Sequence, residues 1–398
     1  MAKLKNYNGR YCESDYENAF IAFLEKEGWT YTAGNNSARE KKTDVLIAED
    51  FSSFIANTNA DLLTEEVEQI YDTVRLAGAE SDFATLHKVY KWMVNGIQFT
   101  PQSGLPIIVS LIDFEQPENN IFRVVNQLTV DYINNGQREN RRPDVLLYVN
   151  GMPLCVIELK NPADANATIY DAWEQITIRY WRDIPHLLHY CPLACISDGV
   201  KTRLGTVRTP YEHFYAWRRV NDGDKISTMP FAETETMIKG VYAPARFLEI
   251  FRDYIYFQDE IFDCDEREIV CRYPQFFAAR LLRQSIVKSV VEQTGKGGTY
   301  FGATGCGKTY TMAFLARQLA LRCSDIPEIG SPTIVMIVDR DELQEQGIKL
   351  FAKSKEFLNL GEVSVVKDRK NLRQELGARE SKLYPVKWTP INLGYPVE

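Results

Sequence analysis

The first part of the chain alternates between helical and strand-like spacing of its apolar residues. Residues 14–28 predict a helix, because apolar residues recur on one face and Gly28 follows them. Residues 60–97 predict mostly helix by the same spacing. A stretch rich in valine and aromatic residues predicts a strand over 121–132. We therefore expect helices combined with a sheet.

Two apolar runs joined by a turn signal form the most strand-like stretch. Residues 145–149 and 154–157 are almost wholly apolar, and Asn150-Gly151 between them is a strong turn signal. The pattern predicts two neighbouring strands in the sheet. The elements predicted next are a helix over 168–182 and a short buried strand over 193–196.

A second pattern begins near residue 272, where helices and strands alternate. Alternation of this kind implies a parallel sheet with helices on its faces. The predicted elements are helices over 274–292, 308–322 and 341–353, and strands over 299–301, 333–338 and 363–366. Before them, 221–245 looks irregular and 247–262 predicts a connecting helix. The predicted organisation is a first domain over 1–225, a linker over 226–270 and a second domain over 271–398.

Composition indicates a globular protein of two or three domains. The chain has 398 residues, 45% hydrophobic and 25% charged, and domains average about 150 residues. It has no run of 18 apolar residues and no signal-peptide core at its N-terminus, so we expect no transmembrane helix and a cytoplasmic location. The net charge of −8 does not favour DNA binding, although a local basic surface can still bind phosphates.

Histidine is scarce and the cysteines are scattered, which limits the metal chemistry. The chain has eight cysteines and four histidines, with no Cys-x-x-Cys and no cluster with zinc spacing. A hydrolase built from these residues is expected to use a hard cation held by carboxylates.

Charged residues stand at the ends of the two apolar strands. Asp144 opens the first strand after a proline, and Glu158 closes the second. A hairpin brings these carboxylates to one end of the sheet, and Lys160 faces the same side as Glu158 because side chains two apart share a face. Two carboxylates and a lysine suit magnesium-dependent phosphodiester hydrolysis. Glu-x-Lys also occurs at 40–42 and 380–382, so the alternative is an edge strand that ends in solvated charges.

A glycine-rich segment matches Gly-x-x-x-x-Gly-Lys-Thr at every fixed position. Its glycines let backbone N–H groups wrap phosphates at the N-terminus of the following helix. Lys308 is expected to reach the β- and γ-phosphates and Thr309 to bind magnesium. An incidental glycine-rich turn is the alternative. The nucleotide-binding residues predicted here are Gly302, Thr304, Gly305, Cys306 (as a spacer), Gly307, Lys308 and Thr309.

The acidic motif that a motor ATPase needs after a later strand is not evident. Asp341-Glu342 begins a predicted helix instead of ending a strand, and residues 383–398 do not continue the pattern. We therefore expect the chain to stop within its first motor lobe, and to bind ATP without efficient turnover.

A set of segments spread along both domains points to one family. They are Arg142-Pro-Asp-Val-Leu-Leu-Tyr-Val149, Val156-Ile-Glu-Leu-Lys-Asn-Pro162, Asp171-Ala-Trp-Glu-Gln-Ile176, Ile196-Ser-Asp-Gly199, Arg272-Tyr-Pro-Gln275, the phosphate loop and Val338-Asp-Arg-Asp-Glu-Leu-Gln-Glu-Gln346. Together they resemble the R (restriction and motor) subunit of type I restriction endonucleases. The resemblance implies an α/β fold: a PD-(D/E)xK-type nuclease domain with a mixed sheet flanked by helices, then a truncated RecA-like phosphate-loop domain with a parallel sheet.

The resemblance also implies roles for residues of the nuclease site. Asp144 and Glu158 would bind magnesium, and Lys160 would be catalytic. Glu17, on the first predicted helix, would be an additional catalytic acid, and solvated surface is the alternative for it.

Further implied contacts depart from the family pattern or have simple alternatives. Gln175 and Tyr180 would form the family's Gln-x-x-x-Tyr motif in the catalytic site, but Tyr180 comes one residue late and Arg179 stands in its place. Exposed helix surface is the alternative for both. Gln275 would contact the adenine of ATP, and a polar helix N-terminus is its alternative.

The resemblance implies ATP and Mg²⁺ as cofactors, and double-stranded DNA, a methyltransferase subunit and a specificity subunit as partners, with no membrane. The implied function is magnesium-dependent DNA cleavage coupled to ATP-driven translocation. Two alternatives stay open: a repair or defence helicase with an accessory nuclease-like domain, and a non-catalytic scaffold that binds DNA and ATP.

Overall fold

The computed structural model describes most of the chain, which divides into two compact units. The described residues are 13–36, 39–78, 80–161, 168–227, 229, 231–258, 266–323, 326–330, 332–338, 355–358, 362–363 and 382–387. One unit comprises Met1–Ile255 and Arg267–Val270, and the other comprises Tyr256–Glu266 and Cys271–Glu398. The division assigns 226–255 to the first unit, and the domain boundaries suggested by the sequence stay predictions.

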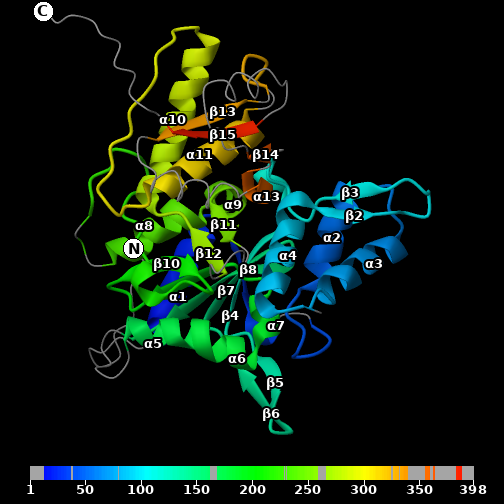
Figure 1. Ribbon diagram of the computed structural model, residues 1–398. Coiled ribbons are helices and arrows are strands. Elements are labelled where there is room, and N and C mark those ends of the chain that lie inside the picture. The colour runs from blue at the N-terminus through cyan, green and yellow to red at the C-terminus, as the bar shows by residue number, and fades with distance from the viewer. Residues whose placement is uncertain are drawn as a thin grey trace, which may run out of the picture. The chain divides into compact units, whose positions relative to one another are not determined.

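A mixed sheet of six strands forms the centre of the first unit (Figure 1). In order across the sheet, the strands are β1 (Thr30–Ala33), β4 (Phe122–Asn126), β7 (Val145–Val149), β8 (Met152–Leu159), β9 (Leu193–Ser197) and β10 (Thr202–Thr206). β1 pairs with β4 and β8 pairs with β9 in parallel, whereas the other neighbours are antiparallel. Every residue of β7 and β8 is buried, so both faces of the sheet are covered at its centre.

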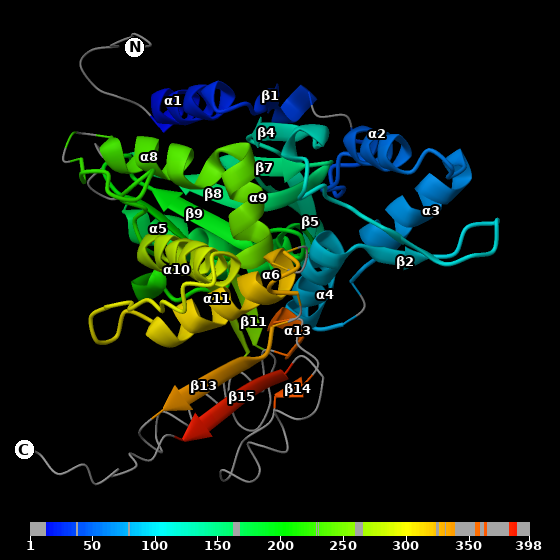
Figure 2. The same ribbon diagram turned by 90° about the horizontal axis from the view of Figure 1, so that it is seen from above.

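Helices pack around this sheet, and several of them contact β8, the strand that contains Glu158 and ends at Leu159. Both α1 (Glu13–Lys26) and α5 (Ile169–Glu174) pack against β8 (Figure 2). The remaining helical segments are α2 (Ala48–Thr58), α3 (Thr64–Arg75), α4 (Asp82–Asn95), the π-helix η3 (Gln175–Tyr180), α6 (Trp181–Asp183), α7 (Pro185–Leu188), α8 (Ala232–Met237), the π-helix η5 (Ile238–Tyr242) and α9 (Pro244–Asp253), with short 3₁₀ turns at Gly34–Asn36, Pro117–Asn119 and Tyr211–His213.

Smaller strand pairs complete the first unit. β2 (Ile97–Phe99) pairs with β3 (Ile107–Val109), and β5 (Val130–Asn134) pairs with β6 (Gln137–Arg141). β12 (Arg267–Val270) also belongs to this unit and packs beside β10. Throughout the described part of the chain, every helix is too short or too polar to cross a membrane.

The turn predicted between the two apolar strands is confirmed, but the second strand begins at Met152 and not at the predicted residue 154, so the connection is a two-residue turn. Asn150 and Gly151 have φ of 50° and 76°, the left-handed pair that a two-residue hairpin turn requires. The Gly151 carbonyl accepts a hydrogen bond from the Ile47 N–H at 2.8 Å, so the turn also anchors the start of α2. A Cβ on Gly151 would lie 2.2 Å from the Ile47 carbonyl oxygen.

Gly151→Ala is therefore expected to destabilise the protein more than Gly136→Ala. The two glycines have φ of 76° and 78° in similar Asn-Gly turns, but nothing lies within 4 Å of a Cβ on Gly136. Strain alone should cost about 1–3 kcal/mol at either site, and the clash should add about 1–3 kcal/mol at Gly151. Urea unfolding of the two variants measures the difference, and equal losses would contradict the steric argument.

Three predicted segments differ from the structure. The strand predicted over 121–132 is two strands, β4 and β5, because Gln127 adopts a left-handed φ of 52° and redirects the chain. The segment 221–245 is not irregular throughout, since it contains α8 and η5 and the start of α9. The helix predicted over 247–262 begins earlier, at Pro244, and ends at Asp253, and β11 (Ile255–Gln258) follows it.

The second unit agrees with the parallel α/β pattern in its described parts. α10 (Tyr273–Val291) packs against α11 (Lys308–Arg322), and β13 (Ile334–Val338), β15 (Lys382–Lys387) and β14 (Glu362–Val363) pair in parallel in that order. A short helix, α13 (Lys355–Leu358), packs beside α11. Residues 299–301 form no strand, because no described strand pairs with them, and Phe301 is 92% exposed. The helix predicted over 341–353 lies outside the described residues.

Candidate active site

The hairpin β7–β8 places Asp144 directly opposite Glu158. Asp144 precedes β7, and the register pairs Val145 with Ile157, so the two carboxylates meet at one edge of the sheet. The Asp144 N–H donates to Glu158 Oε1 at 3.3 Å, and the Leu159 N–H donates to Asp144 Oδ2 at 2.8 Å. The juxtaposition expected from the turn and the two apolar runs is confirmed.

Lys160 directly follows β8, and its side chain lies beside Glu158. Its Nζ lies 3.8 Å from Glu158 Oε2 and donates to Gln175 Oε1 at 3.0 Å. Its backbone N–H donates to the Ser197 carbonyl at 2.8 Å, which continues the pairing with β9. Glu158 is fully buried and the Lys160 side chain is 13% exposed, so these are not solvated charges on an edge strand.

The one-residue delay of Tyr180 is absorbed by a π-helical turn. Gln175 and Tyr180 begin and end η3, a segment with more residues per turn than an α-helix. In an α-helix, residues five apart point about 140° away from each other, whereas a π-turn aligns them. Gln175 Nε2 accordingly donates to the Tyr180 hydroxyl at 2.8 Å, and that hydroxyl donates to Glu158 Oε1 at 2.6 Å. Arg179, at the expected place of the tyrosine, pairs with Glu174 instead.

Burial and charge perturb the acids of this site. Burial raises the pKa of the Glu158 carboxyl well above its usual range, and the Asp144 charge raises it further, while Lys160 and the Tyr180 hydrogen bond lower it. Burial, with the Glu158 charge, also raises the pKa of Tyr180 well above its usual range. Tyr180 therefore stays a hydrogen-bond donor at neutral pH. A bound cation would remove the main cost of ionising Glu158.

Glu17 reaches the same edge of the sheet from α1. It is 7% exposed, so the solvated-surface alternative is wrong. The Asn126 and Gln127 amides donate to its two carboxylate oxygens, both at 2.5 Å, and the same Gln127 Nε2 donates to Asp144 Oδ1 at 3.2 Å. Burial raises the pKa of Glu17, the two amides lower it, and the Asp144 charge raises it. The first helix is thus tied to Asp144 through amide side chains.

The pattern of the sequence did not single out Asn126 and Gln127. Asn126 ends β4 opposite Val145, and the Gln127 N–H donates to the Asp144 carbonyl at 3.0 Å. They meet Glu17 and Asp144 only because β4 and β7 are neighbours in the sheet. In the sequence, the only indication of these two residues is that a polar pair, Asn126-Gln127, follows the apolar residues of β4.

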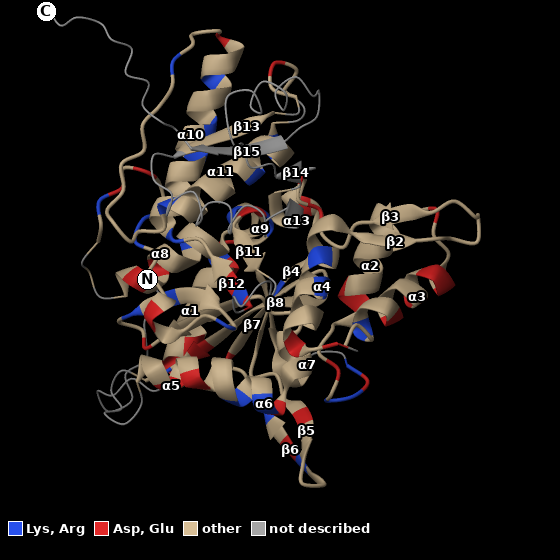
Figure 3. Cartoon of the chain, in the orientation of Figure 1, with Lys and Arg blue, Asp and Glu red and all other residues tan. Residues whose placement is uncertain are grey.

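Acidic and basic residues are interspersed over the first unit (Figure 3), and two of the arginines that precede Asp144 form ion pairs. Arg138 pairs with Asp131 across the β5–β6 hairpin at 2.7 Å, and Arg141 pairs with Asp183 at 2.6 Å. Asp183 lies at the end of the helix that contains η3, so the second pair ties the hairpin to that helix.

The phosphate loop lies at the start of α11, within the second unit. Gly305 and Gly307 have φ of 77° and 78°, a conformation that glycine adopts without strain. Lys308 Nζ donates to the carbonyls of Gly302 and Ala303 at 2.8 and 3.0 Å. Thr304 lies in the turn of the loop, and Thr309 lies in the first turn of α11. Cys306 lies close to Gly302, since a Cβ on that glycine would be 2.8 Å from the Cys306 Sγ.

Gln275 connects the start of α10 to this loop. Its Oε1 accepts from the Arg272 N–H at 2.8 Å, which caps the helix, and its Nε2 donates to the Gly307 carbonyl at 3.0 Å. The side chain is buried, with 4% exposed. The contact with Arg272 agrees with the alternative of a polar helix N-terminus. The contact with Gly307 does not, because it supports the backbone of the phosphate loop. Contact with adenine stays a prediction.

Comparison with known families agrees with this arrangement. The family model described as type I restriction enzyme R protein N terminus matches residues 10–213, just over half of the chain. The chain belongs to this family. A second model, described as SWI2/SNF2 ATPase, matches residues 274–387. The type I restriction R family was therefore correctly predicted from the sequence.

Two relatives in this family match most of the chain. The type I restriction enzyme HindI endonuclease subunit of Haemophilus influenzae is 29% identical over 384 residues, which cover 92% of the chain and 35% of that protein. The protein of Methanocaldococcus jannaschii named as the endonuclease subunit of the type I restriction enzyme MjaIXP is 28% identical over 364 residues, covering 84% and 34%. The chain thus spans about a third of the length of these relatives.

The residues of this R-family site fit one magnesium ion. Among the described residues, no three His, Cys, Asp or Glu side chains group as a ready-made metal cage. Magnesium needs only one or two carboxylates, with water and substrate oxygens as its other ligands. Glu158 Oε2 is buried and accepts no hydrogen bond from any described residue, which leaves it available to a cation. Asp144 and Glu158 would hold the ion.

Proposed function

We propose that this chain supplies DNA cleavage and ATP-driven movement along DNA to a type I restriction complex. The observation that supports it best is the hydrogen-bonded series that runs from Asp144 through Glu158 and Tyr180 to Gln175 and Lys160. A buried carboxylate costs stability unless it is paired, so this arrangement favours a chemical role over a structural one. The site would form a PD-(D/E)xK-type nuclease centre.

The side chains around the site would have different roles in phosphodiester hydrolysis. Bound Mg²⁺ would polarise a phosphate oxygen and lower the pKa of the attacking water. The Tyr180 hydroxyl donates to Glu158 Oε1, and the Leu159 N–H donates to Asp144 Oδ2. Glu158 Oε2 and Asp144 Oδ1, which also accepts from Gln127, would hold the cation. Lys160, held by Gln175, would donate hydrogen bonds to the charge that develops on the phosphate oxygens.

The second unit would bind ATP in a RecA-like domain. The first turn of α11 presents backbone N–H groups and the positive end of the helix dipole to phosphates. Lys308 would exchange the carbonyls of Gly302 and Ala303 for phosphate oxygens, and Thr309 would bind the magnesium that accompanies ATP. ATP and Mg²⁺ are thus the proposed cofactors.

The proposed partners are double-stranded DNA, a methyltransferase subunit and a specificity subunit. The names of the relatives, endonuclease subunits of type I restriction enzymes, favour this over a repair helicase or a scaffold. The test is cleavage of plasmid DNA by the chain reconstituted with both subunits, ATP and Mg²⁺. Cleavage that persists in Glu158→Gln would exclude the proposed site.

Gln127 is expected to act through its amide, not through its backbone alone. Gln127→Gly should relieve the left-handed strain, about 1 kcal/mol, which offsets part of the stability lost with the amide hydrogen bonds to Glu17 and Asp144. Without the amide, Glu17 and Asp144 lose their shared donor, so cleavage should fall about 10-fold and require more Mg²⁺. Magnesium titration of plasmid cleavage, with thermal unfolding alongside, measures both effects.

Gln127→Ala serves as the matched control. It loses the same amide and keeps the strain at φ of 52°, so it should cleave as poorly as Gln127→Gly but unfold at a lower temperature. If Gln127→Gly cleaved like the wild type while Gln127→Ala did not, the residue would matter only for its backbone conformation.

A further inference from the structure

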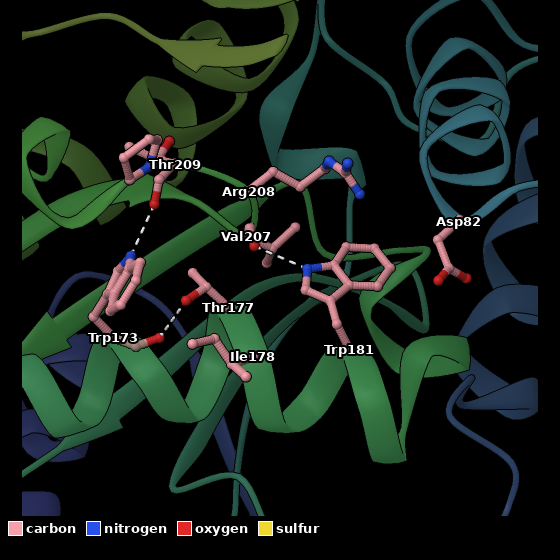
Figure 4. A pocket seen from close by; sticks show the side chains of 9 residues that line it. Asp82, Trp173, Thr177, Ile178, Trp181, Val207, Arg208 and Thr209 are labelled. Atoms are coloured by element: carbon pink, nitrogen blue, oxygen red, sulfur yellow. Dashed lines mark hydrogen bonds between the residues drawn. The ribbon is translucent and has the colours of Figure 1, made fainter. Parts of the chain in front are cut away.

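A groove lies on the side of the η3 helix that faces away from Glu158. The groove has a volume of about 410 Å³, within the range of small-ligand sites (Figure 4). One wall is the helix and the other is the segment that follows β10. The lining residues used here are Trp173, Ile178 and Trp181 on the helix, and Val207, Arg208 and Thr209 opposite them.

Both tryptophans are held in place by the opposite wall. Trp173 Nε1 donates to the Thr209 carbonyl and Trp181 Nε1 donates to the Val207 carbonyl, each at 2.9 Å (Figure 4). In an ordinary α-helix, residues eight apart are rotated by about 80°, but the π-turn between them absorbs about one residue and brings them nearly into line. The turn that aligns Gln175 with Tyr180 therefore also sets both indoles on the groove.

Cationic and aromatic side chains alternate along this face. The Arg208 guanidinium lies 5.2 Å from the Phe83 ring and 5.7 Å from the Trp181 ring. Trp173 lies 6.1 Å from Tyr211, and the Arg203 guanidinium lies 5.6 Å from Tyr211. Ile178, on the helix wall of the groove, is 48% exposed. Asp82, the acid at the rim, is paired with His189 at 2.8 Å.

We propose that this groove binds unpaired nucleotides of the DNA substrate beside the cleavage site, an inference that rests on the proposed function. Aromatic rings give bases a stacking surface without sequence preference, and arginines pair with the phosphates between them. The two arginines complement a polyanion better than they complement an apolar peptide. The groove and the catalytic contacts lie on opposite sides of one helix, so a strand that crosses this helix would be held on both.

Binding of a fluorescent oligothymidine of about 12 nucleotides to the full 398-residue chain tests the proposal. The variants are Arg208→Gln and Ile178→Glu, both at exposed positions where the fold is expected to tolerate change. Each should weaken binding about 5- to 10-fold, and Arg208→Gln should lower the slope of log K against log salt by about 0.7–1. Arg182→Gln, one residue beyond Trp181 and outside the groove, should bind within about 2-fold of the wild type.

The same variants separate this proposal from the function on which it rests. If both groove variants bind the oligonucleotide like the wild type, the groove proposal is wrong, whether or not Glu158→Gln abolishes cleavage. If they instead weaken only the association with the methyltransferase and specificity subunits, the groove is a protein-docking site and the proposal is again overturned. Weakened oligonucleotide binding together with cleavage that survives Glu158→Gln would uphold the groove and reject the nuclease site.

Discussion

Replacing Glu158 by glutamine, or Lys160 by alanine, is expected to lower DNA cleavage by the reconstituted complex at least about 1,000-fold. Glu158→Gln removes the charge of a fully buried carboxylate whose free Oε2 would bind the cation. Lys160→Ala removes the ammonium 3.8 Å from that oxygen. Conversion of supercoiled plasmid to linear DNA measures the loss. The double variant should be little worse than either single one, because the two groups act as a unit.

The sequence itself supplies the matched control for this experiment. Glu40 and Lys42 repeat the Glu-x-Lys pattern but are exposed, so Glu40→Gln and Lys42→Ala should cleave like the wild type. ATP hydrolysis by the reconstituted complex should persist in all four variants, since the phosphate loop is unaltered. Full cleavage by Glu158→Gln, or equal loss in the control pair, would refute the assignment of the site.

Glu158→Gln is also expected to stabilise the metal-free protein at neutral pH. The pKa of Glu158 is raised in the folded state, so folding favours its protonated form. The free energy of unfolding therefore falls as pH rises from the ordinary glutamate range through the raised pKa. Glutamine removes this pH-dependent cost. Thermal unfolding in a chelator at pH 5 and pH 8 should show a smaller pH effect for the variant, and Mg²⁺ should stabilise the wild type more.

Lys308→Ala is expected to weaken binding of a non-hydrolysable ATP analogue about 100-fold. The lysine already lies over the loop, with its Nζ on two loop carbonyls, and its charged hydrogen bonds to phosphate would be lost. Calorimetry of the 398-residue chain measures the affinity. Lys296→Ala, an exposed lysine before the loop, is the control and should bind normally. Equal affinity of Lys308→Ala and the wild type would exclude a phosphate-loop site.

The fold could be predicted best where local pattern and tertiary environment agree. β7 matches the predicted 145–149, and α11 matches the predicted 308–322, because an uninterrupted apolar run and a glycine-capped helix each specify one structure locally. Prediction was worse where strand formation depends on pairing with a distant strand. Residues 299–301 are apolar enough for a strand, yet no described strand pairs with them.

The residues of the candidate site also divide into those that local pattern predicts and those that depend on tertiary contacts. Asp144, Glu158 and Lys160 could be placed together from the turn and the period of two along a strand. Asn126 and Gln127 could not, because their contact with Glu17 depends on β4 lying beside β7 and on a left-handed φ at Gln127. The hydrophobic pattern of one sequence does not specify which distant strands become neighbours in the sheet.

What the sequence determined by itself is the placement of Asp144, Glu158 and Lys160 at the open end of the β7–β8 hairpin, and the glycine-rich loop before α11, because each depends on residues close together along the chain. What only the tertiary structure decided is the position of Tyr180. By sequence it stands one residue late and on the wrong side of an α-helix, and the helix widens into a π-turn there. The contacts of Tyr180 with Glu158 and Gln175 accompany the widened turn, and they require side chains from a separate strand to be in place.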